Sequence, residues 1–175
     1  MAKAPDTHPN LFGKVRMGYA LVESQKLEDW LRFTRDALGL DVREIDRSLV
    51  CRLDNHARRL IISDGPLEDV AALGYQLDDQ ASLDIVLQRL RQHSVAVEAG
   101  DARGAALRGV EAYWRCIGPK GLPIEFYVTP TLSDAPLQML ASGFLTGSAG
   151  MGHVAITSRK PEATLAFWQE ILDAR

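Results

Sequence analysis

An internal repeat constrains this sequence more than any other feature. Residues 17–38 align without a gap on residues 151–172, and eight of the 22 positions are identical. The alignment begins with Met17 on Met151 and continues through a strand-like run, a loop and a helix-like run. Self-similarity over all three kinds of segment is typical of a chain built from repeated supersecondary units.

The repeated unit has the pattern of one strand, one helix and three further strands. An apolar run at 17–22 is followed by an amphipathic helix at 26–38, which Gly39 ends, and by short strands at 41–45, 48–53 and 59–62. The same order returns as a strand at 72–77, a helix at 83–92, and strands at 95–98, 112–117 and 122–128. We therefore predict an α+β fold of paired βαβββ modules.

This pattern also divides the chain into segments. We expect a flexible tail at 1–15, a domain of two modules at 16–130 (about 16–66 and 70–130), a linker at 131–149, and the truncated start of a second domain at 150–175. That start contains a predicted strand at 151–156 and a helix at 161–172. Because three strands of its module are missing, we expect it to be weakly anchored unless it packs on the first two modules or on another chain.

Composition narrows the class of protein. The 175 residues carry a formal net charge of -3, and Lys and Arg are scattered, so no basic stripe points to nucleic acid. No apolar run approaches the roughly 18 residues that a membrane span requires, and the polar stretch 1–10 lacks the apolar core of a signal peptide. Cys51 and Cys116 are far apart and lie in strand-like runs. We expect both to be buried free thiols in a cytoplasmic protein.

Four residues are candidates for a metal site or its remnant. His153 is the third residue of the predicted strand 151–156, and Tyr19 and Tyr75 occupy the matching place in the two earlier modules. Glu125 lies in an apolar strand, where a carboxylate is costly unless it is paired or bound to a metal. We expect Tyr19, Tyr75 and Glu125 to converge inside the curved sheet as a vestigial, metal-free site, because neutral tyrosine, with a pKa of about 10, is a poor ligand for a divalent metal. Taken alone, His153 would be an ordinary strand histidine.

Several motifs together resemble one enzyme family. They are Gly18-Tyr19, Leu38-Gly39-Leu40, Leu73-Gly74-Tyr75, the stretch 118–127, and the pair of segments 142–147 and 150–153. The chain resembles the type I extradiol (ring-cleaving) dioxygenases of the vicinal oxygen chelate, or glyoxalase–bleomycin resistance, superfamily. It is especially similar to the dihydroxybiphenyl and catechol 2,3-dioxygenase-like enzymes. The resemblance covers nearly the whole chain.

The resemblance implies a metal-free N-terminal domain and a C-terminal domain that binds Fe(II), with Mn(II) as the alternative, through two histidines and a glutamate. His153 matches the first of these histidines, and the other ligands and the catalytic residues would lie beyond Arg175. The implied partners are a small aromatic diol and O₂, and we also expect a homo-oligomer. With one ligand of three, the 175-residue chain should itself be inactive. Phe144 could approach the substrate pocket, but packing within the linker is the simpler role.

Two other functions remain open at this point. The first two modules would suffice for a non-catalytic protein of the same superfamily that binds small ligands, and a stop codon directly after Arg175 would favour it. A glyoxalase-like metal isomerase or lyase is the other alternative. Tyrosine in place of histidine at Tyr19 and Tyr75 argues against a metal site in the first domain.

Overall fold

The computed structural model describes residues 10–175, which contain two βαβββ modules in succession. The first consists of β1 (Val15–Glu23), α1 (Leu27–Arg32) with a π-helical turn (Phe33–Ala37), β2 (Asp41–Ile45), β3 (Ser48–Arg52) and β4 (Leu60–Ser63). The second consists of β5 (Asp69–Leu77), α2 (Gln80–Gln92), β6 (Val97–Ala99), an additional helix α3 (Ala102–Arg108), β7 (Trp114–Ile117) and β8 (Pro123–Tyr127). The predicted paired βαβββ fold is confirmed.

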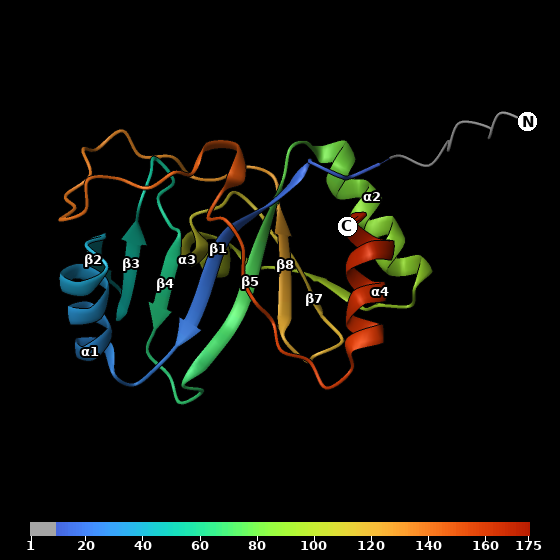
Figure 1. Ribbon diagram of the computed structural model, residues 1–175, viewed down its shortest axis with the longest axis horizontal. Helices are drawn as coiled ribbons and strands as arrows, with labels where there is room; N and C mark the ends of the chain where they lie inside the picture. Colours follow the sequence, from blue (N-terminus) through green and yellow to red (C-terminus); the bar gives the residue numbers. More distant parts are fainter. Residues whose placement is uncertain (1–9) are drawn as a thin grey trace, which may run out of the picture.

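All eight strands join one sheet in the order β2-β3-β4-β1-β5-β8-β7-β6. The opening strands of the modules, β1 and β5, are antiparallel neighbours at the centre (Figure 1). Each is also the parallel neighbour of the last strand of its own module, β4 or β8. The β1–β5 pairing has a register irregularity between Met17 and Tyr19. The two modules therefore share one sheet.

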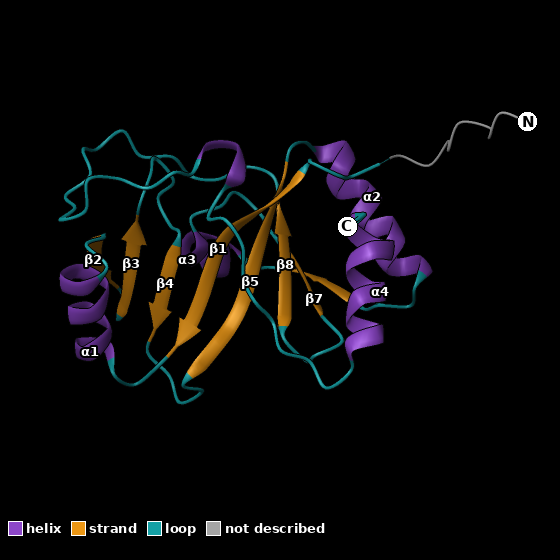
Figure 2. Cartoon of the chain, in the orientation of Figure 1, coloured by secondary structure: helices purple, strands orange, loops and turns teal. Residues whose placement is uncertain are grey.

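The two faces of the sheet carry different layers. Helices α1 and α2 lie on one face together with α4 (Pro161–Leu172), and α3 lies on the other face (Figures 1 and 2). The face under α2 contributes to a core that includes Leu73, Leu83 and Leu90. The face under α3 contributes to a second core around Tyr19 and Tyr127, whose rings stack with centroids 5.4 Å apart. Strand alternation explains this division, because successive side chains point to opposite faces.

Helix α4 packs on the first two modules. Phe167, Ile171 and Leu172 are buried in the same core as the apolar face of α2. The ring of Trp168 lies 5.2 Å from that of Tyr75 in β5, centroid to centroid. Packing on the first two modules was one of the two ways in which we expected this segment to be anchored. Among the described residues the longest helix, α2, has 13 residues, and no described helix has the length and apolar character needed to cross a bilayer.

Two expectations for the ends of the chain were wrong in part. The predicted strand at 151–156 is not formed, and these residues have no regular secondary structure. The segment has no neighbouring strand. A backbone hydrogen bond from the N–H of Met151 to Met17 O, at 3.0 Å, connects it to β1. The expected tail at 1–15 lies largely outside the described residues. Its end is ordered, since Leu11 is fully buried and its backbone N–H donates to Asp173 Oδ2 at 2.7 Å.

The packing of α4 generates a first prediction. Phe167→Ala removes a buried ring and should lower the free energy of unfolding by about 3–5 kcal/mol. Leu165→Ala, on the same helix but 58% exposed, should change it by no more than about 0.5 kcal/mol. Urea unfolding followed by circular dichroism measures both. Equal effects of the two substitutions would contradict the docking of α4 on the sheet.

Candidate functional site

The structure brings two of the expected site residues together beneath α3. The hydroxyl of Tyr19 donates to Glu125 Oε2 at 2.7 Å, and both side chains are buried. Strand β5 lies between them, because Gly74 pairs with Tyr19 on one side and with Glu125 on the other. A Cβ at Gly74 would lie only 2.3 Å from Tyr19 Cζ. The missing side chain of Gly74 therefore lets the ring of Tyr19 cross β5 and reach the carboxylate.

Arg108, at the end of α3, completes the cluster. Its Nε lies 2.5 Å from Glu125 Oε2 and its Nη2 lies 2.6 Å from Oε1, so the guanidinium binds the carboxylate at two points. Its Nη1 donates to Gly104 O at 3.1 Å, and its Cζ lies 4.2 Å from the centroid of the Tyr113 ring. Planar two-point recognition of this kind is the strong form of a carboxylate ion pair.

The pKa values in this cluster follow from burial and charge. Burial raises the pKa of the Tyr19 hydroxyl well above its usual value, and the negative charge of Glu125 raises it further. Burial alone would lower the pKa of Arg108, but the hydrogen bonds and charge of Glu125 outweigh it and raise that pKa. Both shifts favour a neutral phenol at Tyr19 and a charged guanidinium at Arg108.

These residues do not suit a metal ion. Both oxygens of Glu125 already accept hydrogen bonds from Arg108, and Oε2 also accepts one from Tyr19. A metal would have to displace a buried cation, and the phenol is held in its neutral form. Throughout residues 10–175 there is also no group of three or more His, Cys, Asp and Glu side chains arranged to hold a metal.

Tyr75 does not join Tyr19 and Glu125, so the expected convergence of three residues was wrong in this respect. It follows Gly74 in β5 and therefore points to the opposite face of the sheet. There it packs against Trp168 of α4, and burial raises its pKa to about 12. The similar Gly-Tyr dipeptides at Tyr19 and Tyr75 hid this difference, because the register irregularity of β1 pairs Tyr75 with Met17 and Gly74 with Tyr19.

His153 lies on the Tyr75 side of the sheet. It is exposed, and it lines a groove of about 720 Å³ together with Phe12, Tyr75 and Trp168. No side chain of the described residues forms an ion pair with it. Phe144 is 42% exposed in the linker and is not part of the wall of this groove. The structure thus places His153 and Glu125 in different sites.

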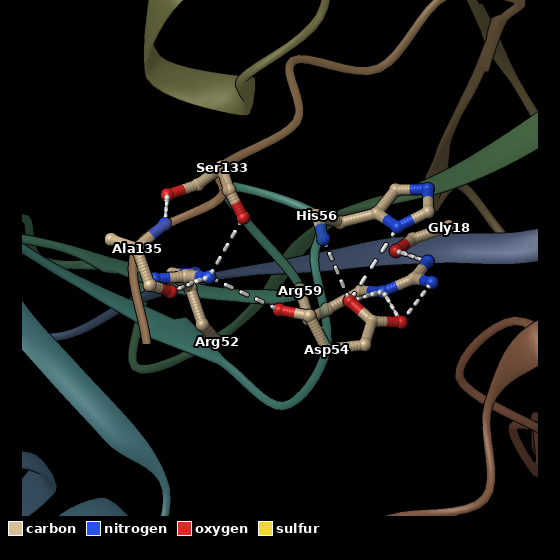
Figure 3. A network of polar contacts seen from close by, with 7 residues as sticks. All are labelled: Gly18, Arg52, Asp54, His56, Arg59, Ser133 and Ala135. Carbon is tan, nitrogen blue, oxygen red and sulfur yellow. Dashed lines mark hydrogen bonds and ion pairs between the residues drawn. The ribbon is translucent and has the colours of Figure 1, made fainter. Parts of the chain in front are cut away.

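A second buried polar network connects the first module to the segment after β8 that contains Ser133 and Ala135 (Figure 3). Arg59 is buried, pairs with Asp54 through Nε and Nη2, and donates from Nη1 to Gly18 O at 2.9 Å. Arg52, also buried, lies 3.3 Å from Asp41 and donates from Nη2 to two linker carbonyls, those of Ser133 (3.2 Å) and Ala135 (3.1 Å). Sequence reasoning missed this network. The one signal for it was the cluster of charged residues between two apolar strands at 52–59.

Comparison with known proteins agrees with the fold and with the motifs. Residues 17–65 match the family model for the first domain of dihydroxybiphenyl dioxygenase (BphC D1). The chain is 33% identical over 164 residues to the biphenyl-2,3-diol 1,2-dioxygenase of Paraburkholderia xenovorans, covering 89% of this chain and 53% of that protein. It is 31% identical over 161 residues to the 3-methylcatechol 2,3-dioxygenase of Pseudomonas putida, covering 90% and 55%.

A solved structure supports the architecture. The crystal structure of BphC, a halotolerant catechol dioxygenase, superimposes with a TM-score of 0.84 at 23% identity, over 90% of this chain and 54% of that one. The chain therefore has the fold of the vicinal oxygen chelate proteins. Its sequence is similar to extradiol ring-cleaving dioxygenases over about half of their length, which confirms the resemblance seen in the sequence. It spans about half the length of the curated relatives that it matches.

The buried ion pair generates a second prediction. Glu125→Gln leaves the buried charge of Arg108 without its partner and should lower the free energy of unfolding by about 3–5 kcal/mol. Arg115→Ala should cost less than about 1 kcal/mol, because Arg115 is 42% exposed and lies 3.9 Å from the same carboxylate. Urea unfolding at pH 7 measures both.

A combined variant separates charge from shape. Apolar residues of similar volume can replace a buried ion pair with little loss of stability. The triple change Tyr19→Phe, Arg108→Met and Glu125→Met should therefore be more stable than Glu125→Gln alone. A triple variant less stable than Glu125→Gln would show that the cluster contributes more than mutual charge compensation.

The Asp54 network generates a third prediction. Burial alone would raise the pKa of Asp54, but hydrogen bonds from His56 and Arg59 outweigh it and hold that pKa well below its usual range. A carboxyl group with a depressed pKa in the folded state stabilises the fold above its unfolded pKa of about 4, and this stabilisation is lost as the pH falls below that value.

Asp54→Asn should lower the free energy of unfolding at pH 6, and the difference in stability from the wild type should narrow towards pH 3. Urea midpoints across this range test it, with Asp84→Asn, at an exposed position of α2, as the control. A gap that does not change with pH would refute the assignment.

Proposed function

We propose that this chain is the N-terminal domain, with the beginning of the catalytic domain, of a metal-dependent extradiol dioxygenase. The enzyme would cleave the ring of a catechol-type, dihydroxybiphenyl-like diol with O₂. In this proposal, residues 16–130 are the metal-free domain, 131–149 the linker, and 150–175 the start of the catalytic domain.

One observation carries the proposal: the sequence similarity is continuous through both modules, the linker and the segment that contains His153. A match that covers 89% of a 175-residue chain must include residues 21–155, wherever it begins. It therefore includes Tyr75, Glu125 and His153. The matched relatives are named for cleavage of biphenyl-2,3-diol and of 3-methylcatechol. A binding protein of two modules would not need the similarity to extend through the linker.

His153 is the residue that we propose as a metal ligand. It is exposed at the edge of the groove, and no described carboxylate pairs with it, so its imidazole is free to bind a metal. The remaining ligands would come from the half of the relatives that this chain does not span, and Fe(II), or alternatively Mn(II), is the metal we propose. Tyr19 and Glu125, closed off by Arg108, would form the vestigial site of the first domain, and Tyr75 would instead support the docking of α4. For Phe144 we propose a place near the substrate in the complete enzyme.

The proposal extends to the setting of the enzyme. Cys51 and Cys116 are buried free cysteines, and burial raises the pKa of each thiol to about 12, which suits a reducing compartment such as the cytoplasm. Apolar side chains at Leu140, Leu145 and Leu165 are more than half exposed. Exposed apolar surface of this kind favours association into a homo-oligomer.

The test compares this chain with the product of its uninterrupted gene. Each protein is given Fe(II) without oxygen, then 2,3-dihydroxybiphenyl or catechol and O₂, and absorbance of the yellow ring-fission product is followed. We expect the longer protein to form product and the 175-residue chain to form none.

Variants of the longer protein test the role of His153. His153→Ala should abolish turnover and reduce the iron content measured by mass spectrometry. His93→Ala should change neither, because His93 lies at the exposed end of α2, away from the groove. An active longer protein whose His153→Ala variant keeps its iron and its rate would overturn the assignment of His153. A longer protein inactive on both diols would overturn the proposed function.

A further inference from the structure

A second hollow lies on the opposite side of the sheet from His153. It has a volume of about 590 Å³ and is enclosed by α3 and by the β2–β4 half of the first module. Its apolar wall includes Val50 and Leu107, and Ser48 and Ser63 contribute hydroxyl groups. Neither the Glu125 cluster nor the proposed metal ligand borders it, so nothing described above accounts for it.

Arg58 is the unusual residue of this hollow. Its Cγ packs against Gly109, where an added Cβ would lie only 2.5 Å away, so the stem of the side chain is held in place. Nη1 donates to Ala57 O at 3.1 Å, while Nε is buried without a hydrogen-bond partner. Within residues 10–175 no carboxylate lies within ion-pair distance of Arg58. A half-buried guanidinium without a carboxylate partner is costly, and an anion is a chemically suitable partner for it.

The charge recorded nearest to Arg58 is also positive. Burial lowers the pKa of Arg58, and the nearby charge of Arg43 lowers it further. Arg43 has only a distant carboxylate partner, Asp41, at 3.8 Å, and that carboxylate also pairs with Arg52. Arg103, which lines the hollow from α3, forms no ion pair within the described part of the chain.

Three aspartates also line the hollow, but none of them pairs with Arg58. Asp64 pairs with Arg47, and Asp101 accepts the backbone N–H of Gly104 at 2.6 Å as the cap of α3. Asp46 also lines the hollow and belongs to the turn between β2 and β3. The lining therefore contains equal numbers of aspartates and arginines, but neither Arg58 nor Arg103 forms an ion pair with any of these aspartates.

We propose that this hollow binds a small organic carboxylate, with Arg58 as the principal anion-binding residue. The carboxylate would lie against the guanidinium of Arg58, with Arg103 adding charge from α3. The apolar body of the ligand would contact Val50 and Leu107. Planar guanidinium groups match the geometry of a carboxylate, and the mixed lining favours an organic anion over an inorganic one. The site is separate from the proposed dioxygenase function and does not depend on it.

Titration of the 175-residue chain tests this inference directly. Benzoate, a carboxylate on an apolar ring, is the probe, and benzyl alcohol and inorganic phosphate are the comparison compounds. Binding is followed by ¹H–¹⁵N NMR, which also maps the site independently of any variant. We expect saturable benzoate shifts confined to β3, β4, α3 and the residues next to Arg58, and weaker binding at raised salt concentration. Benzyl alcohol and phosphate should bind at least about tenfold more weakly, since each lacks one of the two recognised features.

Two substitutions and a control assign the anion contact. Arg58→Gln should weaken benzoate binding about tenfold or more. Arg103→Gln, at an exposed position of α3, should weaken benzoate binding less than Arg58→Gln does. Because Arg103 is exposed, this variant should fold even if Arg58→Gln does not. Arg91→Gln, at an exposed position of α2 away from the hollow, should leave binding unchanged.

Several results would overturn the inference. They are the absence of saturable benzoate binding, shifts that map elsewhere, an affinity for benzyl alcohol or phosphate equal to that for benzoate, and a folded Arg58→Gln variant that binds as tightly as the wild type. If Arg58→Gln fails to fold, unchanged binding by Arg103→Gln together with binding that is insensitive to salt would have the same consequence.

Discussion

The antiparallel pairing of β1 with β5 is the constraint on which the rest of the structure depends. It joins two modules that each supply half of the sheet. On the outer sides of this central pair, β4 is the parallel neighbour of β1 and β8 that of β5. It also places Gly74 beside Tyr19, and the absence of a side chain at Gly74 gives the Tyr19 ring its path to Glu125. One backbone pairing thus determines both the continuous sheet and the position of its most deeply buried polar cluster.

The Glu125 cluster shows how a carboxylate can remain in an apolar interior. A buried carboxylate without a partner is strongly disfavoured. Here Arg108 supplies the opposite charge at two points and Tyr19 a further hydrogen bond. The guanidinium of Arg108 thus binds both oxygens of the Glu125 carboxylate, where a metal ion would otherwise have to bind. His153 lies on the other side of the sheet, so the features that suggest metal binding belong to the segment after the linker.

Much of the fold could be predicted from the sequence, because apolar periodicity and the internal repeat report on local structure. The strand 41–45 and the helix 161–172 have the predicted bounds. Helix α3 was missed because it is short and contains Gly104, although Asp101 and Gly109 are suitable capping residues at its two ends. With α3 the partner of Glu125 was missed as well. The strand expected at 151–156 does not form, because a strand requires a neighbouring strand and a local apolar pattern does not show whether one is present.

The position of Tyr75 illustrates the same limit at the level of one residue. A one-residue difference in register moves a side chain to the other face of a sheet, and the irregularity in β1 is not visible in the Gly-Tyr motif that Tyr19 and Tyr75 share. Arg52 and Arg59 were also out of reach of sequence patterns, because their partners include carbonyl groups of Gly18, Ser133 and Ala135, far away along the chain. Contacts between distant segments of the chain require the structure.

The central claim is that an internal ion pair, and not a metal, occupies the interior of this domain. Anaerobic calorimetric titration of Fe(II) into the 175-residue chain tests it most directly, with Glu125→Gln and His153→Ala measured alongside. The account predicts no saturable one-to-one binding by any of the three proteins. Tight binding of one equivalent of iron that is lost in Glu125→Gln and kept in His153→Ala would contradict it.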